Sequence, residues 1–324
     1  MLYPFVFHPI FKDRIWGGRE LERLYSKNLP AATPIGESWE ISDRPGDASV
    51  IANGPLAGKD LHWLMEHHRA EILGNAKSSA EGRFPLLCKI LDAREKLSLQ
   101  VHPPASRAKE LKGEPKTEMW YIADAAPDAS LYVGLKHGVT RDQFEKKIAD
   151  GTVADCFHRI PVKTGDTMFL PSGRVHAIGD GLVIFEIQQN SDTTYRVFDW
   201  HRVGLDGKPR ELHVKQSLAS IDFEDFEPKL VSTPFAADGK AHKRSLVHDP
   251  LFNVEAWQLP SGANGALKPH QLQILAVTKG QAEIKSGTTA VALTAGQFCL
   301  VPASLDQSQV MAKTGVELLR VEAH

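Results

Sequence analysis

Side chains of the types that bind divalent metals occur in two short extended segments of the chain. In the segment Leu97–His102, a strand alternates its faces with a period of two, which puts Ser98, Gln100 and His102 on one side. Taken alone, this pattern favours an ordinary strand with one solvated face. The second segment carries Glu118 beside bulky and aromatic side chains, where an unpaired carboxylate would be costly. Glu118 therefore needs a partner, and a metal ion is one candidate.

A third segment adds a histidine next to a tight turn. Gly165 and Pro171 are separated by five residues, and His176 follows Gly173 by three positions. On neighbouring strands of a barrel, glutamine, histidine and glutamate side chains can converge as nitrogen and oxygen ligands. Such a set suits zinc, and it also suits iron, cobalt or manganese. The four candidate metal ligands are Gln100, His102, Glu118 and His176.

An acid and an arginine further along the chain could act on a substrate. The segment Leu182–Gln188 places Glu186 among apolar neighbours. Burial of a carboxyl raises its pKa toward the working range of a general base. Ten residues later, Arg196 lies in a mostly apolar segment, where its guanidinium needs an anionic partner. A structural ion pair between Glu186 and Arg196 on adjacent strands is the alternative interpretation.

Composition and charge exclude several classes of function. The 324 residues suffice for two ordinary domains, and the formal net charge of −2 offers no basic face for nucleic acid or an anionic membrane. The three scattered cysteines include no CxxC motif, which fits a reducing compartment. The apolar segment Met1–Phe11 lacks a basic start and a cleavage site, so we predict a buried strand there instead of a signal peptide. We expect a cytoplasmic protein.

Most of the chain predicts short strands separated by Gly, Pro, Asn and Asp. The clearest are Ser38–Ser42, Leu97–His102, Glu118–Ala123, Leu131–Gly134, Thr167–Leu170, Leu182–Gln188 and Thr194–Asp199. Two helices are predicted, Lys59–His68 with Asp60 as its cap and Thr140–Ile148 with Gln143 completing a capping box. Short strands with few helices favour an all-β sandwich or barrel.

The spacing of Gly165 and Pro171 recurs at Gly296 and Pro302. This repeat predicts two related β-barrels, with a boundary in the linker-like residues 225–245. We therefore predict a metal-binding catalytic domain at residues 1–235 and a degenerate β domain at residues 236–324. Alignment of the two prolines puts Gln307 where the first repeat has its histidine, so we expect no metal in the second barrel.

At these motifs the sequence resembles the cupins. The element from Gly165 to His176 matches the second cupin motif position for position, while Gln100 stands where the first motif usually has a histidine. That substitution, with Glu118 further on, is similar to the type I phosphomannose isomerases. Other segments that resemble this family are Ile15–Gly18, Gly36–Glu40, Pro85–Lys89, Lys116–Glu118 and Glu186–Arg196.

The resemblance implies an all-β cupin of the jelly-roll type, with two β-barrel domains and a few short helices. It implies one zinc ion per chain and the interconversion of mannose 6-phosphate and fructose 6-phosphate through an enediol(ate). The implied metal ligands are Gln100, His102, Glu118 and His176. The implied catalytic residues are Glu186 and Arg196, and the implied substrate-binding residues are Ser98, Lys116 and Arg196. An ordinary surface position for Lys116 is the alternative.

Two other functions compete with this interpretation. Two histidines and a glutamate could hold ferrous iron in a cupin oxygenase, and a cupin could also bind a sugar without catalysis. Gln100, Lys116 and Arg196 suit a phosphosugar better than an apolar substrate. We expect a small phosphosugar as the only partner, with no nucleic acid and no membrane, and a monomer or weak homodimer.

Overall fold

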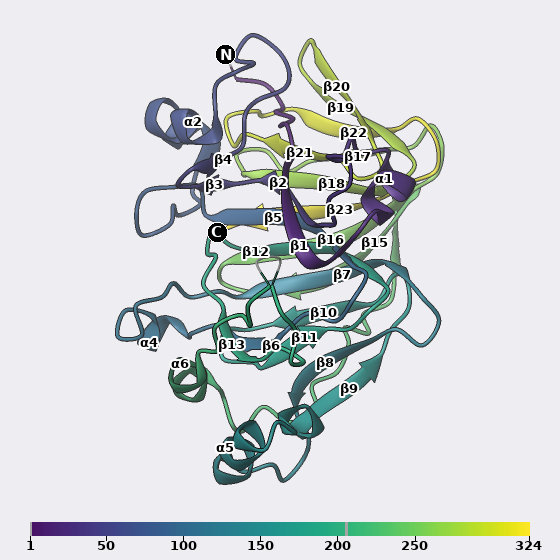
Figure 1. Ribbon diagram of the computed structural model, residues 1–324. Helices are drawn as coiled ribbons and strands as arrows, with labels where there is room; N and C mark the ends of the chain where they lie inside the picture. Colours follow the sequence, from purple (N-terminus) through teal and green to yellow (C-terminus); the bar gives the residue numbers. More distant parts are fainter. Residues whose placement is uncertain (1, 205–206) are drawn as a thin grey trace.

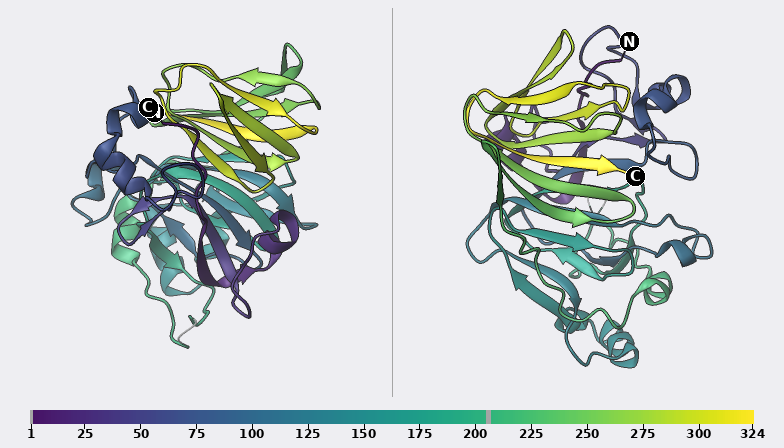
Figure 2. Two further views of the ribbon diagram at one scale, coloured as in Figure 1. Left: turned by 90° about the horizontal axis from the view of Figure 1, so that it is seen from above. Right: turned by 180° about the vertical axis from the view of Figure 1, so that it is seen from behind.

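The computed structural model describes residues 2–204 and 207–324, in which strands predominate and helices are few (Figure 1). Four large antiparallel sheets form two pairs, one pair from each half of the chain. Seen from behind, the sheets of the second half lie directly above those of the first half (Figure 2). No helix within the described residues is both long and apolar enough to cross a membrane.

The first half contributes a six-stranded and a five-stranded sheet. The order of the six-stranded sheet is β1 (Ile10–Gly18), β2 (Ile35–Ile41), β5 (Leu86–Ala93), β12 (Leu182–Gln189), β7 (Glu118–Ala125) and β10 (Thr167–Leu170). The order of the five-stranded sheet is β13 (Tyr195–Phe198), β6 (Leu99–Val101), β11 (His176–Ile178), β8 (Ser130–Leu135) and β9 (Phe157–Pro161). A short hairpin pairs β3 (Asp43–Arg44) with β4 (Asp47–Ala48).

The second half contributes a six-stranded and a four-stranded sheet. The order of the six-stranded sheet is β14 (Ala236–Asp238), β15 (Ala241–His248), β16 (Phe252–Leu259), β23 (Val316–Ala323), β18 (Gln273–Lys279) and β21 (Phe298–Val301). The order of the four-stranded sheet is β17 (Asn264–Ala266), β22 (Ser308–Ala312), β19 (Gln281–Ser286) and β20 (Thr289–Thr294).

The two halves repeat one strand order. The run β5-β12-β7-β10 of the first half corresponds to β16-β23-β18-β21 of the second, and β6-β11-β8-β9 corresponds to β17-β22-β19-β20. Gly165 precedes β10 and Gly296 precedes β21, with φ of 90° and 82°, a left-handed conformation that glycine adopts without a Cβ clash. The short sequence repeat therefore marks equivalent turns. The domain boundary drawn at residues 235 and 236 stays a prediction.

Three apolar layers separate the four sheets. One lies between the two sheets of the first half and includes Trp120, Leu131 and Ile184. Another lies between the two sheets of the second half and includes Leu275 and Ile284. The largest core joins the halves, because residues of β5 and β12 share it with residues of β16, β18 and β23. The two six-stranded sheets therefore pack on each other through one common core.

The helices of the described residues are short. They are α1 (Glu20–Tyr25), α2 (Leu61–His67), α3 (Arg69–Leu73), α4 (Ala105–Ala108), α5 (Arg141–Ala149), α6 (Val214–Ser220) and the 3-10 helix η1 (Val153–Cys156). The two predicted helices are confirmed as α2 and α5. Asp60 accepts the N-cap hydrogen bond of α2, and Thr140 with Gln143 forms the capping box of α5.

The predicted N-terminal strand Met1–Phe11 is wrong in its extent. Met1 lies outside the described residues, and between Leu2 and Pro9 only isolated bridges at Phe5 and Phe7 form. The first strand, β1, begins at Ile10. Pro4 and Pro9 cannot donate the backbone hydrogen bonds of a ladder, which explains why this apolar segment is buried without being a continuous strand.

Candidate metal centre and substrate cavity

A cavity of about 600 Å³ opens between the two sheets of the first half. Strands β1, β2, β5, β6, β12 and β13, or residues next to them, contribute its walls. Five of the residues singled out in the sequence line this one cavity, namely Ser98, Gln100, Lys116, Glu186 and Arg196. The strand pairing therefore brings together residues that are up to 98 positions apart, from Ser98 to Arg196.

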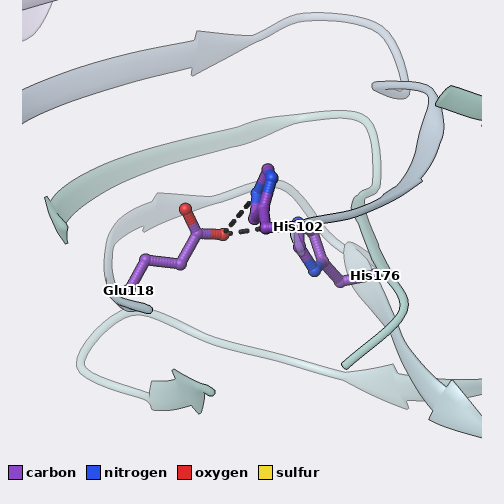
Figure 3. A group of neighbouring side chains, drawn as sticks. All are labelled: His102, Glu118 and His176. Atoms are coloured by element: carbon purple, nitrogen blue, oxygen red, sulfur yellow. Dashed lines mark ion pairs between the residues drawn. The ribbon is translucent and has the colours of Figure 1, made fainter. Parts of the chain in front are cut away.

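His102, Glu118 and His176 form a buried cluster (Figure 3). His102 directly follows β6, Glu118 opens β7 and His176 opens β11. Glu118 Oε1 lies 3.7 Å from His102 Nε2 and 3.3 Å from His176 Nε2, and one ligand atom from each side chain lies within 4.8 Å of the others. These three side chains therefore present their ligand atoms to a common point.

The backbone fixes both histidine rings. His102 Nδ1 lies 2.8 Å from the carbonyl oxygen of Thr193, and His176 Nδ1 lies 2.9 Å from that of Arg174. A hydrogen bond from each Nδ1–H leaves each Nε2 with a lone pair directed at the cluster. Within the described part of the chain, both Nε2 atoms and both Glu118 carboxylate oxygens are buried without a hydrogen-bond partner. Buried polar atoms without partners are costly, so the donor set fits a metal ion that would satisfy them.

Electrostatics keeps the three side chains in their ligating forms. Burial lowers the pKa of His102 to about 3, with Lys116 acting in the same direction, and burial also lowers the pKa of His176. Burial alone would raise the pKa of Glu118, but Lys116, His102 and His176 outweigh it and hold that pKa well below 4.5. Neutral imidazoles beside an ionised carboxylate are the protonation states that bind metal.

Gln100 is paired with two other residues of the candidate site. It lies directly opposite His176 across the β6–β11 pairing and opposite Arg196 across β6–β13. It also lines the cavity next to the histidine cluster. Its ligand role stays a prediction.

Glu186 lines the cavity, and only one of its two carboxylate oxygens accepts a hydrogen bond from the described residues. Its Oε2 accepts a hydrogen bond of 2.9 Å from Trp120 Nε1. Its Oε1 lies 3.4 Å from Lys89 Nζ and 3.8 Å from Lys116 Nζ, and no group of the described residues donates a hydrogen bond to it. Burial raises the pKa of Glu186 above its ordinary value, although Lys116 and Lys89 oppose the shift. A carboxylate oxygen of this kind can take up a proton.

Two of the structural alternatives are wrong. Glu186 forms its ion pairs with Lys89 and Lys116, and none with Arg196 among the described residues. Lys116 is buried, with only 5% of its surface exposed, and its Nζ lies 2.7 Å from Glu118 Oε2 in an ion pair that is not aligned as a hydrogen bond. It is therefore not an ordinary surface lysine.

Arg196 lines the cavity from the five-stranded sheet. Its Nη1 donates a hydrogen bond of 2.8 Å to the carbonyl oxygen of Glu211, and its buried Nε has no partner within the described residues. No carboxylate of the described residues forms an ion pair with it. Burial lowers the pKa of Arg196, and the neighbouring Arg210 adds to the shift. The guanidinium therefore lacks the anion that its surroundings call for.

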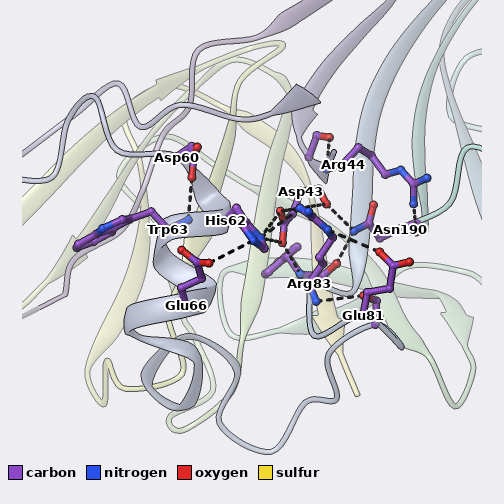
Figure 4. Close-up of polar contacts among 12 residues, drawn as sticks. Asp43, Arg44, Asp60, His62, Trp63, Glu66, Glu81, Arg83 and Asn190 are labelled. Atoms are coloured by element: carbon purple, nitrogen blue, oxygen red, sulfur yellow. Dashed lines mark hydrogen bonds and ion pairs between the residues drawn. The ribbon is translucent and has the colours of Figure 1, made fainter. Parts of the chain in front are cut away.

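The loop after β12 is held by a polar network that begins in a distant segment (Figure 4). Asn190 Nδ2 donates to the carbonyl oxygens of Asp43 and Phe84, at 3.1 and 2.9 Å. Asp43 is fully buried and accepts hydrogen bonds from Phe84 N and Arg83 Nη1, both at 2.8 Å. The same loop carries Thr193, whose carbonyl oxygen orients His102. The network thus fixes the loop that aims one of the histidines.

Lys89 and Glu37 also line the cavity, although neither was predicted as a site residue. Lys89 is 4% exposed in β5, a strand whose eight residues are all buried, and it pairs directly with Glu186 across β5–β12. A lysine in a mostly apolar strand is a signal that could have identified it, because a buried ammonium needs a carboxylate. Glu37 carried a similar signal in the buried strand β2.

Comparisons with known proteins give a consistent result. The family model described as phosphomannose isomerase type I, catalytic domain, matches residues 5–126. A mannose-6-phosphate isomerase of Streptococcus mutans is 36% identical over 313 residues, which is 95% of both chains, and one of Bacillus subtilis is 36% identical over 94% of both. The crystal structure of a mannose 6-phosphate isomerase from Bacillus subtilis superposes with a TM-score of 0.90 at 30% identity, over 99% of both chains. The all-β cupin prediction is confirmed by this similarity.

Proposed function

This chain belongs to the type I phosphomannose isomerase family, and we propose that it interconverts mannose 6-phosphate and fructose 6-phosphate with one zinc ion per chain. The observation that carries the proposal is the buried His102–Glu118–His176 cluster with its unsatisfied ligand atoms. Lys116, which forms an ion pair with Glu118, lines a cavity that also holds a carboxylate and several cations. The names of the relatives supply the substrate.

Four side chains would hold the metal. His102 and His176 would bind through Nε2 and Glu118 through a carboxylate oxygen, because these atoms are buried and free of partners among the described residues. Gln100 would add its amide oxygen from the cavity wall. A nitrogen and oxygen donor set of this kind suits zinc. When bound, zinc would polarise the sugar carbonyl and stabilise the negative charge that develops on its oxygen.

The reaction transfers a proton between C2 and C1 of the open-chain sugar, while a hydroxyl proton moves between O2 and O1. Glu186 Oε1 is the group we propose to remove the carbon-bound proton and to return it to the neighbouring carbon. Its raised pKa brings it closer to the working pH of a general base. The enediol(ate) formed between the two transfers would lie among the cations that surround this carboxylate.

Arg196, Lys116 and Ser98 would bind the substrate. Arg196 offers a guanidinium without a carboxylate partner, which suits a phosphate or an enediolate oxygen. Lys116 lies between Glu118 and Glu186 and can stabilise negative charge at the reacting end. Ser98 is buried at the cavity wall and offers a hydroxyl for the sugar. These cations suit a phosphosugar better than the apolar substrate of an iron oxygenase. A cytoplasmic location and a monomeric or weakly dimeric state remain predictions.

The test is a coupled assay of fructose 6-phosphate formation from mannose 6-phosphate. The purified protein would be measured as isolated, after chelation, and after zinc is restored. We expect activity to disappear with the chelator and return with zinc. A folded, fully zinc-loaded protein that does not turn over would contradict the proposal, and ferrous iron with oxygen would then be the next assay.

A further inference from the structure

Six charged side chains form a row of alternating sign across five neighbouring strands. The row follows the order β1-β2-β5-β12-β7, which can be traced in Figure 1. Its members, from the edge of the sheet to the metal cluster, are Arg14, Glu37, Lys89, Glu186, Lys116 and Glu118. Lys116 lies two residues before the start of β7, and the others lie within the strands. The row therefore connects the rim of the cavity to a metal ligand through consecutive ion pairs.

Lys89 is shared between two carboxylates in this row. Its Nζ lies 3.7 Å from Glu37 Oε2 and 3.4 Å from Glu186 Oε1, and the face of the Trp39 ring lies beneath it at 5.0 Å. Both distances exceed that of a well-formed charged hydrogen bond, about 2.8 Å. The ammonium thus sits between the two carboxylates without closing on either one.

Glu37 is held more tightly than Lys89. Its Oε1 accepts a hydrogen bond of 2.8 Å from Arg14 Nε, and its Oε2 accepts one of 2.6 Å from Trp39 Nε1. Only 8% of its surface is exposed. Because two donors fix this carboxylate, it forms a rigid negative point on the side of Lys89 away from Glu186.

We propose that Glu37 is a positioning residue of the isomerase reaction, which acts by holding Lys89 back from Glu186. This inference rests on the proposed function, in which Glu186 Oε1 carries the proton between the two carbons. Without the charge of Glu37, Lys89 would move toward the remaining carboxylate and form a closed ion pair with Glu186. A lone pair engaged in such a pair is a weaker proton acceptor, so turnover falls while the substrate still binds.

The test combines single and double variants in a cycle. Glu37→Gln removes the charge of the carboxylate and keeps its shape, and we expect kcat to fall about tenfold or more with KM changed by less than about twofold. Lys89→Gln alone lowers kcat as well, because it removes one of the cations that surround the proposed enediol(ate). Because Glu37 acts through Lys89, Glu37→Gln should lower kcat no further once Lys89 is glutamine. Losses that multiply in the double variant, or a change of KM alone, would overturn the positioning role.

Glu40→Gln is the matched control, since it makes the same chemical change in the same strand. Glu40 is equally buried, but it pairs with Lys27 at 2.7 Å and lies against the segment of Gly296, outside the substrate cavity. We expect it to lower the melting temperature without changing kcat. If Glu37→Gln does not fold, Glu37→Asp keeps the charge and withdraws it from Lys89 by about 1.5 Å, one C–C bond. An intermediate kcat supports the proposal, and a native kcat overturns it.

The inference and the proposed function fail in different ways. A native enzyme without activity on mannose 6-phosphate contradicts the proposed function, and the role of Glu37 is removed with it. An active native enzyme whose kcat is unchanged by Glu37→Gln leaves the function intact and removes the role of Glu37. Zinc content is measured for each variant, because a positioning residue at this distance from the ligands should leave it at one per chain.

Discussion

At the scale of single residues, the side chains that would bind the metal differ from those that would act on the sugar. His176 belongs to the buried cluster with unsatisfied ligand atoms, whereas Arg196 faces the cavity from β13 and contacts only a backbone carbonyl among the described oxygens. Each of these two side chains can be removed by substitution while the other is kept. A matched pair of variants therefore distinguishes the two roles.

His176→Ala and Arg196→Ala should both lose turnover, but only His176→Ala should lose the metal. The first removes a ligand, so we expect zinc affinity to fall by more than about 100-fold and activity to disappear with it. The second should keep zinc at one per chain while kcat/KM falls by about 100-fold or more. Metal analysis and the coupled assay on both proteins check this. Retained zinc in His176→Ala would remove that histidine from the site, and normal turnover in Arg196→Ala would make the arginine structural.

Glu37 should also link stability to pH. Burial works against its charged form, but Lys89 and Arg14 outweigh burial and hold its pKa at about 2, compared with 4.5 for a free glutamate. A carboxylate with a depressed folded-state pKa contributes stability above its unfolded pKa of about 4.5, and this contribution is lost as the pH falls toward about 2.

We therefore expect the gap in unfolding free energy between the native protein and Glu37→Gln to shrink by about 2 kcal/mol from pH 6 to pH 3. Urea titration of chelated samples measures the gap without interference from the metal. A gap that stays constant over this range would mean that Glu37 has an ordinary pKa in the folded protein.

At the scale of elements, one loop depends on a distant hairpin. Asn190 bonds to the backbone at Asp43 and Phe84, and three residues later Thr193 orients His102. Asn190→Ala removes two buried hydrogen bonds and should cost about 2 kcal/mol of stability. Because the loop also aims a ligand, zinc affinity should fall by about 10-fold.

Glu66→Ala is a suitable control for this loop. Glu66 lies on the exposed side of the same network, and its one ion pair among the described residues is with His62, at 3.7 Å (Figure 4). Competition with a chelator measures the affinity, and we expect Glu66→Ala to match the native protein. A native zinc affinity in Asn190→Ala would show that the loop does not need this anchor.

The elements were more predictable from the sequence than their contacts. Strands such as Thr167–Leu170 and Leu182–Gln188 follow from apolar and β-branched runs bounded by turn residues, and the caps of α2 and α5 follow from local hydrogen bonds. The pairing of Lys89 with Glu186 depends on strand register between distant segments, and the contact of Asp43 with Asn190 spans 147 positions. Periodicity determines which face a side chain occupies, but it does not determine which strand lies beside it.

At the scale of the whole molecule, the same fold occurs twice with different interiors. In the first half, Glu118 pairs with Leu170 and Gln188, and in the second half Gln273 pairs with Val301 and Glu322 at the equivalent register. The position of Glu186 is taken by Arg320, whose guanidinium bonds to Gln273 at 2.7 Å and to Glu255 at 2.9 Å. The polar groups of the second half form hydrogen bonds with one another, whereas the cluster in the first half has buried ligand atoms without partners among the described residues. That the second half binds no metal remains a prediction.

The common core between the six-stranded sheets predicts that the two halves unfold together. Phe298 in β21 is 3% exposed and stacks on Phe185 in β12, with ring centroids 5.5 Å apart. Phe298→Ala should cost about 3–5 kcal/mol, and the loss should appear in both halves because the rings bridge them.

Leu293→Ala provides the comparison, because Leu293 is buried only within the core of the second half. If the halves are one cooperative unit, this variant also lowers the protection of β12 in the first half, by the same free energy as that of β23 in the second. Hydrogen exchange with mass spectrometry, read on peptides from the two strands, gives both values in one experiment. Protection that falls in β23 but not in β12 would mean that the halves unfold separately, and that the apolar layer between them is an interface between independent domains.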